Sequence, residues 1–228
     1  MASQEAYELL AQRLSTLLKP SAVDTELSVQ TIKEVTALLQ QSLNQLKIDQ
    51  CYDGCVVQGD HNPFKAPSEV INLQNDPNKI RIGQNCDLWG ELMVLRTGGE
   101  IVIGDHTYMG EFNKIWSNAK VTLGNNIMTS HHVYIVDSDF HEMDSNLRVK
   151  NFAGSVANNA DSMASTDHIP KAPVVIEDKV WINFNVSIYK GVTIGEGSVI
   201  ASNAVINKDI PPYSLAVGNP ARVIKKLT

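Results

Sequence analysis

Isoleucine recurs at every sixth position over a long stretch in the C-terminal half of the chain. The six positions are Ile176, Ile182, Ile188, Ile194, Ile200 and Ile206. An α-helix has a period of 3.6 residues and a β-strand a period of two, so neither element predicts a repeat of six. A triangular coil does, because each hexad supplies one short strand and one corner, and three hexads complete a turn. We therefore expect Ile176 to stack inside the coil on Ile194, Ile182 on Ile200 and Ile188 on Ile206.

Less regular hexads precede this stretch. Their predicted first residues are Ile82, Leu88, Val94, Ile103, Met109, Ile115, Leu123 and Thr129. The hexads fail between about residues 138 and 171, where the sequence is polar and without a pattern. A long loop inside a compact solenoid is unusual and often carries function, so this insertion is a candidate for shaping a site.

The first 48 residues read as two helices, predicted over 5–18 and from near 28 to 46. Their apolar stripes are formed by Leu9, Leu10, Leu14, Leu17 and Leu18, and by Ile32, Val35, Leu39, Leu43 and Leu46. Because an open coil end exposes strand edges, we expect these helices to cap the solenoid or to contact a neighbouring subunit. The predicted divisions are a helical extension (1–50), a connecting segment (51–80), a β-solenoid (81–212) with an inserted loop (138–171), and a basic tail (213–228) that leaves the coil.

The charge and composition of the chain limit the kinds of partner and the cell compartment that we expect. The formal net charge of −6 argues against nucleic acid or an anionic membrane as the main partner. The N-terminus lacks the features of a signal peptide and no apolar run has transmembrane length, so we expect a cytoplasmic protein. Its three cysteines, Cys51, Cys55 and Cys86, are expected to be free thiols, because they are sparse and odd in number.

Three segments resemble the C-terminal signature of the hexapeptide-repeat acyltransferases, most closely the sugar and polysaccharide O-acetyltransferases. They are Ala172-Pro-Val-Val-Ile-Glu-Asp-Lys-Val-Trp-Ile-Asn, Gly191-Val-Thr-Ile-Gly-Glu-Gly-Ser-Val-Ile and Gly218-Asn-Pro-Ala-Arg-Val-Ile-Lys-Lys. The resemblance implies an all-β solenoid, a left-handed parallel β-helix, behind the N-terminal helical extension. It also implies acetyl-CoA as co-substrate, a small-molecule or polysaccharide acceptor, and a homotrimer with the site between adjacent solenoids.

His141 is the predicted general base. It lies where the hexads give way to the loop, and Ser138-Asp-Phe-His, followed by Asp144, resembles the segment that carries the catalytic histidine in sugar O-acetyltransferases. A hydroxyl is a poor nucleophile, and an imidazole with a pKa near neutral can remove its proton as the new bond forms. Asp139 or a backbone carbonyl could orient the imidazole, and Asp144 is assigned to the substrate. The second choices for the base are His131 and His132.

The resemblance also assigns the cofactor contacts. These fall on Phe184, Ala201, Ser202, Asn207, Lys208, Arg222 and Lys225. The cations among them suit the phosphates of coenzyme A. Trp181 matches a tryptophan of the family and is either an aromatic packed at a corner or a wall of the acyl or acceptor pocket. No metal is expected.

Three other functions remain open at this stage. An N-acetyltransferase acting on an amino-sugar or antibiotic would use the same fold and the same base. A zinc enzyme of the γ-carbonic anhydrase type needs three converging histidines, two of them about five residues apart, and His106, His131 or His132, and His141 do not have that spacing. A non-catalytic solenoid scaffold would have no reason to retain both the His141 segment and the basic tail.

Overall fold

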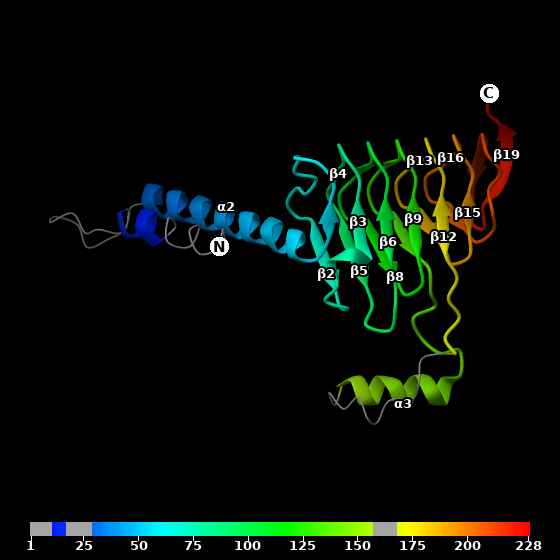
Figure 1. Ribbon diagram of the computed structural model, residues 1–228, viewed down its shortest axis with the longest axis horizontal. Coiled ribbons are helices and arrows are strands. Elements are labelled where there is room, and N and C mark those ends of the chain that lie inside the picture. The colour runs from blue at the N-terminus through cyan, green and yellow to red at the C-terminus, as the bar shows by residue number, and fades with distance from the viewer. Residues whose placement is uncertain (1–10, 17–28, 157–167) are drawn as a thin grey trace.

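A three-sided parallel β-solenoid forms most of the structure, which is a computed structural model that describes residues 11–16, 29–156 and 168–228 (Figure 1). Each coil places one short strand on each side, and strands from successive coils pair in parallel. Three sheets result, running the length of the solenoid with six, seven and six strands. Each side of a coil thus consists of one strand and one corner, and this explains the period of six residues that the hexads show.

The strands of the three sheets follow in chain order. The first sheet holds β1 (Val56–Val57), β3 (Ile80–Ile82), β6 (Ile101–Ile103), β9 (Val121–Leu123), β12 (Val174–Ile176) and β15 (Thr193–Ile194). The second holds β4 (Asp87–Leu88), β7 (Tyr108–Met109), β10 (Met128–Thr129), β13 (Trp181–Ile182), β16 (Val199–Ile200), β18 (Ser214–Val217) and β19 (Arg222–Lys226). The third holds β2 (Glu69–Asn72), β5 (Glu91–Val94), β8 (Lys114–Ser117), β11 (Tyr134–Val136), β14 (Ser187–Ile188) and β17 (Val205–Ile206).

The predicted stacking of the isoleucines is confirmed. Ile176 pairs with Ile194, Ile182 with Ile200 and Ile188 with Ile206, and all six side chains are fully buried. These residues form the core together with the inward residues of the earlier coils. A continuous apolar column inside the solenoid is therefore what holds successive coils together, because burial of apolar surface is the main favourable term in folding.

One predicted hexad start is wrong by two residues. Leu92 pairs with Ile115, whereas Val94 pairs with Ser117. Strand β5 has four residues, and both Leu92 and Val94 point inward. The sequence offered two equivalent apolar positions here, and only the pairing with the next coil distinguishes them.

One corner of the solenoid is built by a ladder of polar side chains. The backbone N–H groups of Gln84, Asp105 and Asn125 donate to the side-chain oxygens of Asp105, Asn125 and Asp178, each one coil further along, at 2.8, 2.9 and 2.8 Å. The hydrogen bond from the Asn125 N–H lowers the pKa of Asp178 below its usual value. These bonds satisfy backbone donors that the strands leave unpaired.

The residue after each of these polar residues has left-handed backbone. Asn85, His106, Asn126 and Lys179 have φ between 55° and 57°. Asparagine tolerates this region better than most residues, which explains its frequency at the corners. His106 therefore has a turn position in the solenoid, independent of any chemistry.

The coil extends further at both ends than the sequence predicts. At the N-terminal end, β1 pairs with β3 and β2 with β5, so the first coil falls inside the predicted connecting segment 51–80. At the C-terminal end, β18 pairs in parallel with β16. Only then does the chain turn back as β19, antiparallel to β18. The first part of the predicted tail is thus a further strand of the solenoid.

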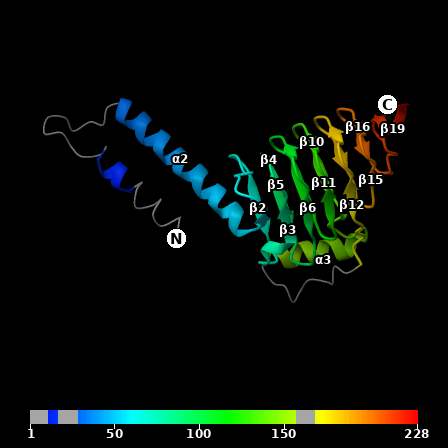
Figure 2. The same cartoon turned by 45° about the horizontal axis from the view of Figure 1, so that its top comes forward.

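Helix α2 (Val29–Asp53) projects from the N-terminal end of the solenoid (Figures 1 and 2). It continues seven residues beyond the predicted end at Leu46, and its last turns cover the first coil, where Ile48 packs against the core. The outer part of its apolar stripe, including Ile32 and Leu43, is exposed. Of the other predicted helix, residues 11–16 are helical, and the remainder lies outside the described residues. Within the described chain, no helix combines the length and the apolar composition that a membrane crossing requires.

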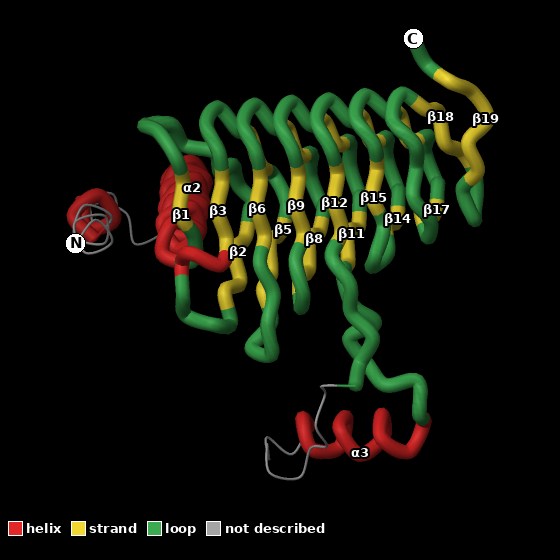
Figure 3. The backbone as a smooth tube through the Cα atoms, turned by 45° about the vertical axis from the view of Figure 1, so that its right-hand side comes forward, coloured by secondary structure: helices red, strands yellow, loops and turns green. Residues whose placement is uncertain are grey.

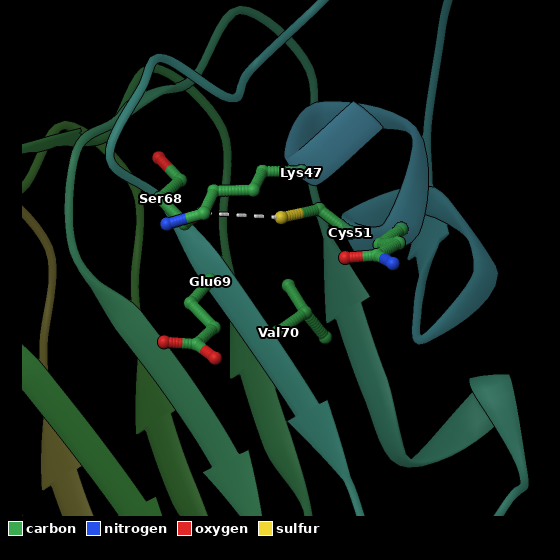
Figure 4. A pocket seen from close by; sticks show the side chains of 6 residues that line it. Lys47, Cys51, Ser68, Glu69 and Val70 are labelled. Carbon is green, nitrogen blue, oxygen red and sulfur yellow. Dashed lines mark hydrogen bonds between the residues drawn. The ribbon is translucent and has the colours of Figure 1, made fainter. Parts of the chain in front are cut away.

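Two of the cysteines lie at this junction. Figure 4 shows Cys51 facing Ser68 and Val70 across a cavity of about 100 Å³ between α2 and the first coil. All three cysteines are free, as predicted, and the structure shows that they are also buried. Burial raises the pKa of Cys51 to about 11 and that of Cys55 to about 12. These thiols are therefore protonated core residues and not nucleophiles.

Candidate active site

The insertion 138–171, called the arm below, leaves the solenoid between β11 and β12. It carries a helix that stands clear of the coil (Figure 3). Its two ends are paired where it leaves. Ser138 forms an antiparallel bridge with Lys171, and the Asp139 N–H donates to the Pro170 carbonyl at 3.0 Å. The Ala172 N–H donates to the Asp137 carbonyl at 2.9 Å. The arm thus has a closed base, which we call the stem (residues 138–140 and 170–171).

Asp137, just inside the coil, anchors the start of the arm. Its side chain is completely buried and its two oxygens accept three hydrogen bonds from the preceding coil. The donors are the hydroxyl of Ser117 at 2.6 Å and the backbone N–H groups of Asn118 and Ala119 at 2.7 and 3.0 Å. A buried carboxylate with this many donors fixes the local backbone.

Helix α3 (Ser145–Val156) lies within the segment that the sequence predicts as unpatterned loop. Asp144 caps its N-terminus, since the Asp144 Oδ1 accepts the backbone N–H groups of Asn146 and Leu147 at 2.8 and 3.0 Å. The carboxylate predicted to contact substrate therefore has a structural role at the start of a helix.

A buried carboxylate ties α3 to the arm. Glu142 is 2% exposed and accepts a hydrogen bond from the side-chain amide of Asn151 on α3. His168 Nε2 lies 4.0 Å from the same carboxylate. The Arg148 guanidinium donates to the Glu142 carbonyl at 2.7 Å. These contacts fix the helix relative to the chain that precedes it.

His141 faces α3 across an open cavity of about 300 Å³. The cavity is lined by His141, Arg148, Val149 and Phe152. The backbone N–H of His141 donates to the Asp139 carbonyl at 2.7 Å, whereas its imidazole has no hydrogen-bond partner among the described residues. The imidazole is exposed, so a ligand in the cavity can reach it. The arrangement offers a free ring nitrogen beside a partly apolar wall, as a general base near a sugar-sized acceptor requires.

The Asp139 carboxylate has a different partner from the one predicted. Its Oδ1 forms an ion pair with Lys190, which follows β14 on the next coil. Within the described chain this contact, and not one with the His141 imidazole, is the side-chain interaction of Asp139. Of the two groups considered for orienting the imidazole, the Asp139 carboxylate is thus bonded to Lys190 in the described structure, and sequence reasoning missed Lys190.

The other candidate histidines lie at corners of the solenoid. The His132 ring stacks on Phe112, with the ring centres 5.1 Å apart and an angle of 14° between the planes. His132 has left-handed backbone with φ of 57°, like His106. Among the described residues no group of three or more His, Cys, Asp or Glu side chains is arranged to hold a metal ion.

The predicted cofactor residues fall into three groups. Phe184 and Ser202 occupy the same corner position on successive coils. The Asn203 N–H donates to the Phe184 carbonyl there at 3.1 Å, and Ala201 precedes Ser202. Asn207 and Lys208 lie at the corner after β17, on the same edge of the solenoid as the stem of the arm. Arg222 and Lys225 lie on β19, whose side chains are all exposed.

A second cavity lies at the C-terminal end of the coil. It has a volume of about 400 Å³ and is lined in part by Tyr213, Lys225 and Lys226. Two ammonium groups beside an aromatic ring suit a phosphorylated nucleotide. In the described part of the chain, the three groups thus lie at the corner after β13 and β16, at the corner after β17 and on β19.

Trp181 belongs to an exposed apolar row on the outer face of the second sheet. Met128 pairs in register with both Tyr108 and Trp181, and the exposed fractions are 39% for Tyr108, 47% for Met128 and 43% for Trp181. Phe112 and Phe184, at the corner that follows, are about half exposed. The predicted corner-packing role of Trp181 is thus not seen, because its ring lies on the surface.

Comparison with known proteins finds a family match and named relatives. Residues 173–208 match the family described as bacterial transferase hexapeptide (six repeats). A Mycobacterium tuberculosis protein named as an acetyltransferase is 34% identical over 162 residues, which cover 71% of this chain and 49% of that protein. A Saccharomyces cerevisiae protein, also named as an acetyltransferase, is 36% identical over 131 residues, 58% of each chain. The chain spans about half the length of the curated relatives it matches.

A solved structure shows the same fold. AntD, an N-acyltransferase from Bacillus cereus solved with dTDP and coenzyme A, is 16% identical with a TM-score of 0.56, and the match covers 83% of this chain and 90% of AntD. At that identity the likeness concerns the fold alone. The hexads, the three-sided parallel solenoid and the match of residues 173–208 show that the chain carries the bacterial transferase hexapeptide repeat, and the relatives that it resembles are named as acetyltransferases.

Proposed function

We propose that this chain is an acetyl-CoA-dependent O-acetyltransferase that transfers an acetyl group to a hydroxyl of a sugar or polysaccharide. The observation that carries the proposal is the exposed imidazole of His141 beside an open cavity walled by α3, where the described residues offer it no hydrogen-bond partner. The Phe152 ring and Val149 offer an apolar wall to the ring face of a sugar, and Arg148 offers hydrogen-bond donors to its oxygens.

The proposed reaction passes through a complex that holds both substrates. A ring nitrogen of His141 accepts the proton of the acceptor hydroxyl while its oxygen attacks the thioester carbonyl carbon. A backbone N–H stabilises the negative charge that forms on the carbonyl oxygen. The carbon–sulfur bond then breaks, and His141 returns the proton to the departing sulfur. No covalent enzyme intermediate is needed, because the buried thiols are protonated and lie in the core.

We further propose that acetyl-CoA binds between the solenoids of a homotrimer. The three groups of predicted cofactor residues are Phe184, Ala201 and Ser202; Asn207 and Lys208; and Arg222 and Lys225. Because they lie at different corners and at the coil end, one chain alone does not enclose a coenzyme. A neighbouring copy set against the exposed row of Tyr108, Met128 and Trp181 would supply the missing wall, and it would give Trp181 a place beside the substrates.

The test is the variant His141→Ala, assayed with acetyl-CoA and a panel of acceptors that carry hydroxyl or amino groups. We expect kcat to fall about 10²- to 10⁴-fold, the contribution typical of a general base. We expect calorimetry to show coenzyme A binding unchanged. The acetylated atom in the product distinguishes O-transfer from N-transfer.

The matched control is His106→Asn, because His106 is an exposed corner histidine in a backbone conformation that asparagine tolerates. This variant should retain wild-type turnover. Normal turnover in His141→Ala would remove His141 from the mechanism. Failure of the wild-type protein to bind coenzyme A would instead favour a non-catalytic solenoid.

A further inference from the structure

The two residues before His141 are held from both sides by neighbouring coils. The arm leaves β11, which lies between β8 and β14 in the third sheet. From β8, the Trp116 ring meets the Phe140 ring edge to face, with the ring centres 6.0 Å apart and the planes at 81°. From the coil of β14, Lys190 forms its ion pair with Asp139. Asp139 and Phe140 are thus each anchored to a different coil.

The Trp116 anchor is itself fixed, and the Lys190 anchor is partly shielded from solvent. The Trp116 indole N–H donates to the Glu91 carboxylate, and the Lys114 ammonium lies 5.1 Å from the centre of the Trp116 ring. Lys190 and Asp139 have side chains only 29% and 27% exposed. An ion pair that is partly shielded from solvent is screened less by salt than a fully exposed one.

The backbone at this point adopts a conformation that needs support. Phe140 has φ of 58°, in the left-handed region that a bulky aromatic residue rarely adopts. Its N–H donates to the Ser138 hydroxyl at 3.1 Å, and the next N–H, that of His141, donates to the Asp139 carbonyl. Such a conformation persists only where the surroundings fix it, and it is frequent at functional sites.

We propose that Lys190 and Trp116 are positioning residues for His141. They hold Asp139 and Phe140 between adjacent coils and so fix the direction in which the imidazole enters the cavity. The part of Asp139 is then to bind Lys190 and so hold the stem of the arm in place, and not to contact the imidazole. This inference rests on the proposed function, since it assigns the two residues a part in aiming its general base.

The first test compares Lys190→Met with Lys190→Arg in the full-length protein. A displacement of about 1 Å in a catalytic group can lower the rate about 10²-fold, so we expect kcat of Lys190→Met to fall about 10- to 100-fold. The KM for acetyl-CoA should change less than kcat does, because only Asn207 and Lys208 of the proposed cofactor residues lie on the same edge of the solenoid as Lys190, one coil further along. Lys190→Arg keeps the charge and should recover most of kcat. The midpoint of the pH–rate profile should not move in either variant.

The second test concerns Trp116. We expect Trp116→Leu to lower kcat, and Trp116→Phe, which keeps an aromatic edge near Phe140, to retain more of it. Because the two anchors hold adjacent residues of one short segment, the double variant Lys190→Met with Trp116→Leu should lose less than the product of the single losses. Fully multiplicative losses would show that the anchors are independent and would overturn the proposal.

A third measurement does not depend on turnover. Hydrogen exchange of the backbone N–H groups of residues 139–141, all of which are hydrogen-bonded, should be at least about tenfold faster in Lys190→Met than in the wild type. Suppose that exchange is faster in Lys190→Met but the wild type transfers no acetyl group. This result would support the anchoring of residues 139 and 140 and would refute the proposed function. Unchanged exchange in Lys190→Met would overturn the proposed anchoring, whatever the activity of the variant.

The matched control is Arg81→Met. Arg81 lies on β3, near the N-terminal end of the solenoid and not on the coils that hold the stem, and it forms an ion pair with Glu100. It should leave kcat and the exchange of residues 139–141 unchanged. An equal loss in Arg81→Met and Lys190→Met would mean that any lost ion pair weakens the solenoid generally, and the proposal would then be wrong.

Discussion

Inward-pointing side chains contact the coil before and the coil after their own. Ile103 is 2% exposed and pairs with Ile82 on one side and Leu123 on the other. We expect Ile103→Ala to lower the free energy of unfolding by about 2–5 kcal/mol, because it leaves a cavity that both neighbouring coils line. Chemical denaturation followed by circular dichroism measures this change.

The adjacent residue provides the control for that measurement. Val102 lies on the same strand and points outward. Val102→Ala should change the free energy of unfolding by less than about 1 kcal/mol. Equal effects of the two substitutions would contradict the inward assignment of Ile103.

Residue-level prediction succeeded where a contact repeats and failed where it is unique. The stacking of Ile176 on Ile194 follows from the hexads alone, since any triangular coil with that period requires it. The pairing of Lys190 with Asp139 depends on the register between Ile135 and Ile188 across the arm. With Ile135 identified as a hexad start, that register would have brought Lys190 close to the stem.

Helix α3 is an element whose role depends on its N-terminal cap. Asp144→Ala removes the acceptor for two backbone N–H groups and should destabilise the helix by about 0.5–2 kcal/mol. Because α3 carries Arg148, Val149 and Phe152 along the cavity, we expect the KM for the acceptor to rise severalfold while that for acetyl-CoA stays constant. Hydrogen exchange in the first turn of α3 should become faster.

Asp144→Asn separates this capping role from direct contact with substrate. Asparagine is as good an N-cap as aspartate, so the acceptor KM should stay near the wild-type value. If the Asp144 carboxylate bound the acceptor directly, Asp144→Asn would raise that KM as much as Asp144→Ala does.

The sequence does not predict elements that lack a buried apolar stripe. Val149, Phe152 and Val156 of α3 are exposed and Leu147 is only half-buried, so no face of this helix shows the spacing that a core imposes. Strand β1 has two residues, too few to show any period. By contrast, the later hexads predict their strands, because the period continues over six repeats.

At the scale of the whole molecule, the faces of the solenoid differ. The outer face of the second sheet carries the row of Tyr108, Met128 and Trp181, while that of the first sheet carries Arg81, Val102, Thr122 and Val175. Large exposed apolar patches on a soluble protein commonly mark an interface. The second sheet is therefore the face on which we expect a neighbouring chain to pack.

A charge placed in this apolar row tests the proposed assembly. We expect the wild-type protein to sediment at three times the 25.0 kDa of one chain and Met128→Glu to sediment as a monomer, because a carboxylate buried without a partner is strongly unfavourable. Acetyl transfer should fall with dissociation, since the proposed cofactor groups would lose the second wall. Thr122→Glu, on the outer face of the first sheet, should remain trimeric and active. A trimer that survives Met128→Glu would exclude this face as the interface, and a wild-type monomer that is fully active would show that a single solenoid suffices for the reaction.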